Sequence, residues 1–145
     1  MVKILVVNGP NLNMLSIREP EKYGKITLQE IETKMKEFGL KRGLKLKFFQ
    51  SNSEGAIIDF LHQNYKWGKY LIINAGAYTH TSIAIRDAIL SANYLTIEVH
   101  LTNIYKRENF RQKSFISDIA IGVITGFGWL SYLMALEYIY KREGK

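Results

Sequence analysis

Glu98 and His100 lie two positions apart in the segment IEVHLTN, at the end of an apolar, β-branched run. Side chains two positions apart on a strand point to the same side, so this carboxylate and imidazole can interact directly or through a bend at the strand end. A carboxylate beside an imidazole fixes its tautomer and favours its protonated form. The pair is therefore a candidate proton donor, although it can equally be a satisfied polar pair at a strand end.

A second polar group occupies residues 8–24, NGPNLNMLSIREPEKYG, which follow the first apolar run. The segment has the composition of a loop, and it offers an amide, a guanidinium and a phenol on Asn11, Arg18 and Tyr23. Asn11 also suits an ordinary turn. The segment lacks the hydroxyl and glycine series that wraps a phosphate, which argues against a nucleotide or flavin loop.

Further polar candidates follow the third and fourth apolar runs. Asn74 suits a turn and His80 suits the entry to a helix. Asp87 can be a solvated charge on that helix, and Arg107 and Arg111, four positions apart, can be a basic surface face. Each of these structural interpretations is sufficient for its own residue. Most of these groups, however, follow predicted strands and would meet at one edge of the sheet, so several such interpretations would have to hold there at the same time.

Strand and helix patterns alternate along the chain and predict parallel βαβ units. They predict an α/β fold, a flavodoxin-like three-layer α/β/α sandwich with a five-stranded parallel sheet in the order 2-1-3-4-5. Such sheets bind ligands beyond the carboxyl ends of their strands, where the strand order reverses. The predicted strands are 3–7, 44–49, 70–73, 94–99 and 119–125, and the predicted helices are 27–41, 51–65, 82–91 and 129–140.

The last predicted helix, within FGWLSYLMALEYIY, is apolar nearly all round. A helix of this kind is buried, whereas an outer helix of a small three-layer domain normally shows one face to water. Either the helix is covered within its own chain or another subunit covers it, and the pattern favours the second.

Composition bounds the remaining possibilities. The 145 residues suit one domain, residues 1–145, and 47% hydrophobic residues can fill a substantial core. The absence of cysteine excludes disulfides, a thiol nucleophile and a cysteine-based zinc site, and three dispersed histidines give a metal site little support.

No apolar run is long enough for a membrane span or signal peptide, so we expect a cytoplasmic protein. The net charge of +7 suits a solvated basic surface, an anionic small substrate or nucleic acid.

Several segments together resemble type II 3-dehydroquinate dehydratase, namely NGPNLNML, REPEKYG, NAGAYTHTS, IEVHLTN and the RENFR that follows. The similarity covers almost the whole chain in the same order. The resemblance implies a cofactor-free lyase of the shikimate pathway, without a metal, that converts 3-dehydroquinate to 3-dehydroshikimate and water through an enolate. It also implies a single catalytic domain assembled as a dodecamer of four trimers, which would cover the apolar helix.

The resemblance also assigns the reacting groups. Tyr23 would be the base that takes a proton from C2, with Arg18 beside it. Asn11 would help to hold a water against the enolate oxygen. His100 would protonate the departing C1 hydroxyl, and Glu98 would orient it.

The substrate contacts follow from the same resemblance. Asn74, His80 and Arg111 would contact hydroxyl groups of the substrate. Its carboxylate would lie against the backbone amides and side chain around Leu101 and Thr102. Asp87 would reach the site of a neighbouring subunit.

Two positions depart from the family pattern. Ser16 stands where the family's loop usually has glycine. This puts in question the flexibility of the lid, which we define as residues 16–24. The segment RQKSF after Phe110 is a looser match, so Lys113 has no assigned role.

General electrostatics explains why an arginine and a tyrosine would share a loop. An ordinary tyrosine, with a pKa of about 10, is mostly protonated at neutral pH. A guanidinium roughly 4 Å away favours the ionised phenol by about 4 kcal/mol at an effective dielectric near 20. Two other functions remain as alternatives, a flavin- or nucleotide-binding module and a basic nucleic-acid-binding domain, although the sequence has no aromatic-interleaved basic strip.

Overall fold

The fold is a five-stranded parallel sheet with helices on both faces, seen here in a computed structural model that describes residues 1–144. The strand order is β2-β1-β3-β4-β5, which confirms the predicted flavodoxin-like topology. The strands are β1 (Val2–Asn8), β2 (Leu44–Gln50), β3 (Tyr70–Asn74), β4 (Leu95–His100) and β5 (Gly122–Thr125).

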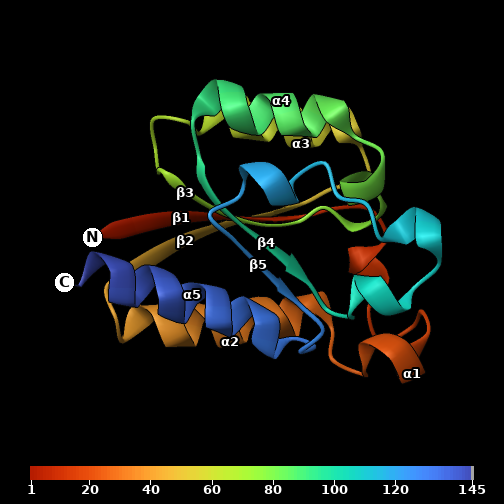
Figure 1. Ribbon diagram of the computed structural model, residues 1–145. Helices are drawn as coiled ribbons and strands as arrows, with labels where there is room; N and C mark the ends of the chain where they lie inside the picture. Colours follow the sequence, from red (N-terminus) through yellow and green to blue (C-terminus); the bar gives the residue numbers. More distant parts are fainter. Residues whose placement is uncertain (145) are drawn as a thin grey trace.

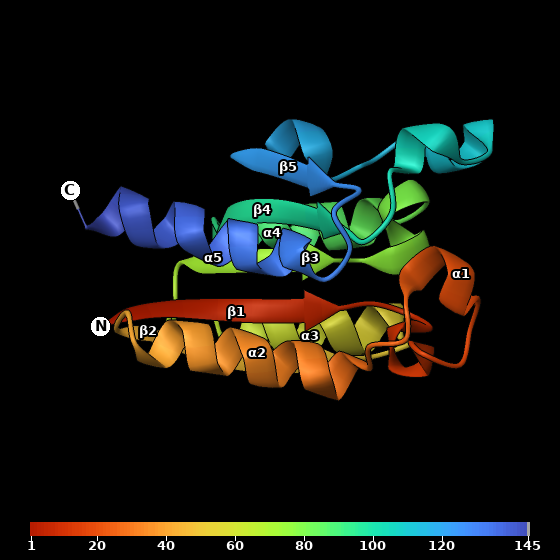
Figure 2. The same ribbon diagram turned by 90° about the horizontal axis from the view of Figure 1, so that it is seen from below.

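Four helices form the two outer layers (Figure 1). The helices α2 (Leu28–Leu40) and α5 (Leu130–Glu143) cover one face of the sheet, and α3 (Glu54–Gln63) and α4 (Ile83–Ala92) cover the other. A short fifth helix, α1 (Pro20–Tyr23), lies at one end of the molecule. Figure 2 shows β1 and β4 running toward that end, whereas the N-terminus and the end of α5 lie at the other.

Local sequence signals explain where the helices begin. Thr27 and Glu30 form the predicted capping box, since Thr27 Oγ1 accepts the Glu30 N–H at 3.1 Å. Ser53 caps α3 through the N–H of Ala56, so this helix begins three residues later than predicted. The last strand likewise begins at Gly122 instead of residue 119, because residues 117–119 form a tight 3₁₀ turn.

Alternating side chains of the strands divide the core into two layers. Ile4 and Val6 of β1 pack toward α2 and α5, whereas Leu5 and Val7 pack toward α3 and α4. Central parallel strands are buried on both faces, which explains their continuous apolar sequences. Glu98 aligns with Ile73 of the neighbouring strand, so it lies on the α3 and α4 face of this sheet.

Helix α5 buries one side and exposes the other. Tyr132, Leu136 and Ile139 are fully buried against the sheet. The opposite side carries large apolar side chains that the described residues 1–144 leave exposed, namely Leu130, Met134, Tyr138 and Tyr140. Within residues 1–144 the chain therefore does not cover this helix all round, so coverage within its own chain does not explain its apolar sequence.

Candidate active site

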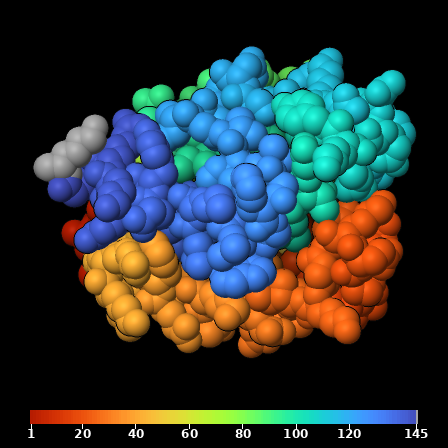
Figure 3. Space-filling view, turned by 60° about the horizontal axis from the view of Figure 1, so that its bottom comes forward, coloured from red at the N-terminus to blue at the C-terminus, as the bar shows by residue number. Residues whose placement is uncertain are grey.

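A pocket lies beyond the carboxyl ends of β1, β3 and β4, where the strand order reverses. On the molecular surface, the segment that contains α1 meets the segment that follows β4 (Figure 3). The pocket brings together nine of the eleven residues predicted for the site: Asn11, Arg18, Tyr23, Asn74, His80, His100, Leu101, Thr102 and Arg111. The other two are Glu98, which lies behind His100, and Asp87.

The dyad of Glu98 and His100 is hydrogen-bonded directly, through His100 Nε2 and Glu98 Oε2. Glu98 is 0% exposed and His100 is 5% exposed. Burial raises the pKa of Glu98, but the hydrogen bond and charge of His100, with the hydroxyls of Ser117 and Ser114, outweigh it and hold this pKa below its usual value. The carboxylate therefore stays ionised and can accept the hydrogen bond of the imidazole.

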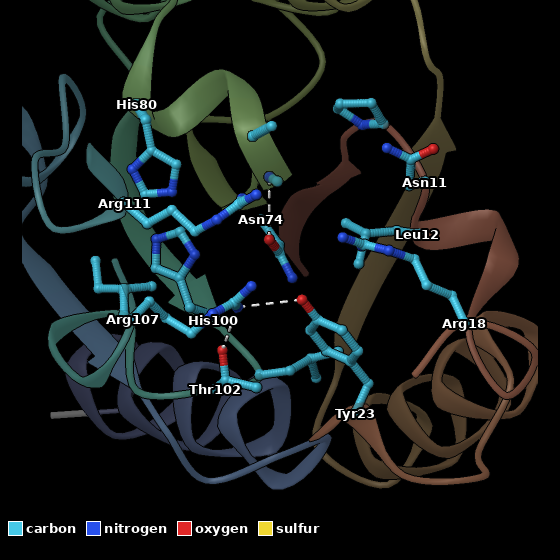
Figure 4. A pocket seen from close by; sticks show the side chains of 15 residues that line it. Asn11, Leu12, Arg18, Tyr23, Asn74, His80, His100, Thr102, Arg107 and Arg111 are labelled. Atoms are coloured by element: carbon cyan, nitrogen blue, oxygen red, sulfur yellow. Dashed lines mark hydrogen bonds between the residues drawn. The ribbon is translucent and has the colours of Figure 1, made fainter. Parts of the chain in front are cut away.

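His80 lies across the pocket from the lid segment and is held differently (Figure 4). Its Nδ1 is 2.7 Å from the carbonyl oxygen of Lys113, and because a carbonyl only accepts, Nδ1 carries the proton. Burial, together with the charges of His100 and Arg111, lowers the pKa of His80 although the Lys113 bond opposes this. His80 is therefore a neutral imidazole whose Nε2 can accept a hydrogen bond.

Asn74 ends β3 and has a fixed side-chain orientation. Its Oδ1 accepts the N–H of Gly76 at 3.2 Å, and its Nδ2 donates to the hydroxyl of Tyr132 at 3.0 Å. Tyr132 in turn donates to Asn8 Oδ1 at 2.5 Å. A fully buried tyrosine on α5 thus orients an amide at the pocket floor.

Tyr23 is contacted by two arginines. Arg107 Nη1 donates to the Tyr23 hydroxyl at 3.1 Å and lies 3.3 Å from Thr102 Oγ1. Arg18 lies over the aromatic ring, with its Cζ 5.3 Å from the ring centroid, and its Nε is 3.6 Å from the Glu19 carboxylate. In this arrangement, Arg107 and not Arg18 is the partner of the phenol oxygen.

The surface interpretation of Arg107 is therefore wrong. Its side chain is only 14% exposed, because the segment after β4 folds back in two tight turns, Ile104–Lys106 and Asn109–Arg111. Arg111 also lines the pocket, and its Nε lies 3.1 Å from Glu108 Oε1. The sequence contained no local signal that places Arg107 at the pocket, because its position depends on these two turns.

Residues 8–24 contain three non-glycine residues with positive φ, Asn11 (69°), Ser16 (77°) and Glu19 (42°), of which the last two belong to the lid, residues 16–24. Asparagine tolerates this conformation, and the Asn11 N–H donates to Asn52 Oδ1 at 3.0 Å. Asn11 therefore forms a turn and also stands at the pocket rim. Ser16 occupies a conformation that favours glycine, which explains why glycine is usual at this position and makes serine the strained choice.

Asp87 is exposed on α4 and, among the described residues 1–144, does not belong to the set that lines this pocket. The same part of the chain contains no group of three or more His, Cys, Asp or Glu side chains arranged to hold a metal ion. It also contains no helix that is both long enough and apolar enough to span a membrane.

An α/β sandwich with a carboxylate–imidazole pair at one strand end and a phenol on a facing loop offers groups of the kind that elimination chemistry uses. A profile of the family Dehydroquinase class II matches residues 2–140, and the chain belongs to this family.

Individual relatives agree. The chain is 55% identical over 140 residues to a 3-dehydroquinate dehydratase of a Nitratiruptor species, covering 97% of this chain and 90% of that protein. It is 51% identical over 146 residues to a 3-dehydroquinate dehydratase of Prochlorococcus marinus (strain MIT 9211), covering 98% and 99%. The crystal structure of a type II dehydroquinase from Butyrivibrio crossotus DSM 2876 superposes with a TM-score of 0.92 at 42% identity, covering 94% and 96%.

Proposed function

We propose that this protein is a 3-dehydroquinate dehydratase, which removes water from 3-dehydroquinate to give 3-dehydroshikimate. Membership of the class II dehydroquinase family supports the reaction. The observation that carries the proposal is that the Glu98–His100 dyad and the Tyr23 phenol face one pocket from opposite sides. An elimination of this type needs a base on one side of the substrate and an acid at the leaving group.

Tyr23 is the proposed base, which takes the proton from C2, next to the ketone. A phenolate is a strong enough base, and nearby positive charge favours its formation. Arg107 donates a hydrogen bond to the phenol oxygen, and Arg18 adds a second positive charge near the ring. Guanidinium groups remain charged when water is excluded, so they suit this role better than lysine.

His100 is the proposed acid, which protonates the C1 hydroxyl as it departs. Its Nε2 is engaged by Glu98, so Nδ1 is the nitrogen that can deliver a proton. Glu98 fixes this orientation and stabilises the imidazolium without contacting the substrate. Asn11 would help to hold a water against the oxygen of the enolate that forms between the two proton transfers.

The remaining pocket groups are proposed to hold the substrate. Asn74, His80 and Arg111 would bind its hydroxyl groups, and the neutral His80 has an acceptor nitrogen for this purpose. The substrate carboxylate would lie against the backbone and side chain at Leu101 and Thr102. The arginines that line the pocket give it a positive potential, which attracts an anionic substrate.

The proposed enzyme is cytoplasmic, uses one catalytic domain and no cofactor, and assembles as a dodecamer of four trimers. The exposed apolar side of α5 supports burial against another subunit. In such an assembly Asp87 would reach a neighbouring site, since it lies apart from the pocket residues of its own chain. Sedimentation tests this part, and a clean monomer at micromolar concentration would remove both the assembly and the role of Asp87.

The experiment that tests the function is direct. Purified protein is mixed with 3-dehydroquinate, and the ultraviolet absorbance of the conjugated product is followed. Wild type and His62→Ala, which changes an exposed histidine on α3, should both produce the rise. His100→Ala should not. No rise with wild-type protein in any buffer would overturn the proposed function.

A further inference from the structure

A carboxylate deep in the protein is held by a short segment that the proposed mechanism does not use. Residues 113–117 follow the pocket arginines and cover the buried side of Glu98. Ser114 Oγ lies 3.1 and 3.0 Å from the two carboxylate oxygens of Glu98. Ser117 Oγ is hydrogen-bonded to Oε1 of the same group.

The direction of the Ser114 bond follows from its other partners. Its Oγ accepts the backbone N–H groups of Ile116 at 3.0 Å and Ser117 at 3.1 Å. A hydroxyl has two lone pairs and one hydrogen, so the hydrogen is the part that remains for Glu98. With the Ser117 hydroxyl and His100 Nε2–H, the carboxyl group receives three donors. A protonated carboxyl would place its own hydrogen against one of them, so this environment selects the carboxylate.

The same segment sets the second histidine of the pocket. The carbonyl of Lys113 accepts the Nδ1–H of His80, which fixes the tautomer of that imidazole. One stretch of five residues thus acts on both histidines, on His80 directly and on His100 through Glu98.

The segment is itself firmly attached to the fold. The N–H of Phe115 donates to the carbonyl of Thr79 at 2.9 Å, and its carbonyl accepts from Arg86 Nη1 at 2.9 Å. Arg86 also pairs with Asp118, and Ile116 is fully buried in the core beneath α4. These attachments keep the segment in place in the absence of substrate.

We propose that residues 113–117 form a clasp that positions both histidines, with Ser114 and Ser117 as positioning residues that keep Glu98 ionised and His100 ready to donate a proton. What His100 does with that proton rests on the proposed function. The effect of the clasp on the two imidazoles does not, so it can be measured without substrate.

Two resonances report the clasp directly. Nitrogen-edited NMR of the substrate-free protein should show the bonded Nε2–H of His100 and Nδ1–H of His80, identified by their loss in His100→Gln and His80→Gln. Ser117→Ala removes one donor to Glu98 while the backbone bonds to Ser114 remain. It should shift the His100 resonance and leave that of His80 unchanged, because His80 uses the Lys113 carbonyl.

The matched control is Ser131→Ala. Ser131 is fully buried on α5, which covers the face of the sheet opposite Glu98, and its Oγ accepts the Phe127 N–H at 3.3 Å. Neither resonance should move in this variant. Ser117→Thr keeps a hydroxyl and should return the His100 resonance toward its wild-type position.

The pH profile of kcat gives a second readout. Loss of a donor favours protonation of Glu98, so the acid-side fall of kcat should move to higher pH in Ser117→Ala. At the optimum kcat should fall by about tenfold, as one charge-assisted hydrogen bond would give, with KM unchanged. The other charged and titratable groups around this cluster are His80, Arg86, Asp87, Glu108, Arg111, Lys113 and Asp118, which the variant retains.

The outcomes separate the two proposals. A shifted His100 resonance in a protein without dehydratase activity would retain the clasp and remove the proposed function. The clasp would be overturned if Ser117→Ala and Ser114→Ala both kept wild-type activity, an unshifted His100 resonance and an unshifted fall of kcat at low pH. If Ser114→Ala fails to fold because its turn is lost, Ser117→Ala alone decides.

Discussion

The two sides of the pocket are built differently. The strand side carries Asn74 and the Glu98–His100 dyad, all of which are at least 95% buried and hydrogen-bonded to protein groups. The loop side carries Tyr23 and Arg18, and the Arg18 side chain is 41% exposed. The proposed acid is therefore held in place by protein groups, whereas the proposed base stands on a loop with weaker support.

The loop side is held by contacts of modest strength. Glu19 forms ion pairs with Arg18 at 3.6 Å and Lys22 at 3.2 Å, and both are partly exposed, so each contributes little. Two positive φ angles, at Ser16 and Glu19, add strain to the same segment. Such a loop can open and close over a pocket, while groups on strands remain fixed. The comparison predicts that substitutions on the two sides differ in kind.

Removing the base should have the largest effect. Tyr23→Phe keeps the ring and its contact with Arg18 but loses the oxygen, so kcat should fall by about 10²–10⁴ with KM largely kept. Steady-state kinetics measures this, with Tyr105→Phe, an exposed tyrosine, as the control. A variant that retained more than half of the wild-type kcat would show that the base lies elsewhere.

The loss of kcat on substitution of Arg107 or Arg18 should follow how directly each arginine contacts the phenol oxygen of Tyr23. Arg107→Ala removes a charged hydrogen bond to the phenol and should lower kcat by about 10- to 100-fold, more than Arg18→Ala, which removes a contact with the ring. If each arginine favours the phenolate, part of the lost activity should return as pH rises. The Arg107→Ala, Tyr23→Phe double variant should be little worse than Tyr23→Phe alone.

Profiles of kcat against pH test this ranking, with the exposed neighbour Lys106→Ala as the control. A larger loss in Arg18→Ala than in Arg107→Ala would restore Arg18 as the main activating residue. A flat loss in both, with no alkaline recovery, would make the arginines substrate or lid contacts.

Substitution of the α5 tyrosine that supports the strand side should affect stability as well as binding. Tyr132→Phe leaves Asn74 Nδ2 and Asn8 Oδ1 without their buried partner, which should cost about 1–3 kcal/mol of unfolding free energy. KM should rise several-fold because the amide of Asn74 loses its fixed orientation. Urea unfolding and kinetics measure both effects, and Tyr65→Phe, which changes an exposed tyrosine that follows α3, should change neither. A stable Tyr132→Phe with unchanged KM would contradict the orienting role.

The smallest effect is expected in the lid. Ser16→Gly relieves a left-handed conformation while adding freedom to the unfolded chain, so stability should rise by about 1 kcal/mol or less. Ser16→Ala keeps the strain and should not be stabilised. Thermal unfolding compares the two variants, and equal stability would show that the φ of 77° carries no cost here.

The sequence predicted the strand side better than the loop side, for physical reasons. Period-two alternation along a strand is a local pattern, so the direct contact of Glu98 with His100 could be anticipated. The partner of the Tyr23 hydroxyl, Arg107, lies 84 positions away in the sequence. Two turns bring it to the pocket, and no local sequence pattern predicts this contact. The hydroxyls of Ser114 and Ser117 were missed for the same reason, since they approach Glu98 from a separate segment.

Exchange of the C2 proton of 3-dehydroquinate in D₂O, followed by NMR, tests the separate acid and base sides most directly. His100→Ala retains the base, so it should exchange this proton faster than the enzyme-free control while forming almost no product. Tyr23→Phe retains the acid but should catalyse neither exchange nor elimination. Loss of exchange in folded His100→Ala, or exchange at the wild-type rate in Tyr23→Phe, would contradict the assignment of a strand-borne acid and a loop-borne base.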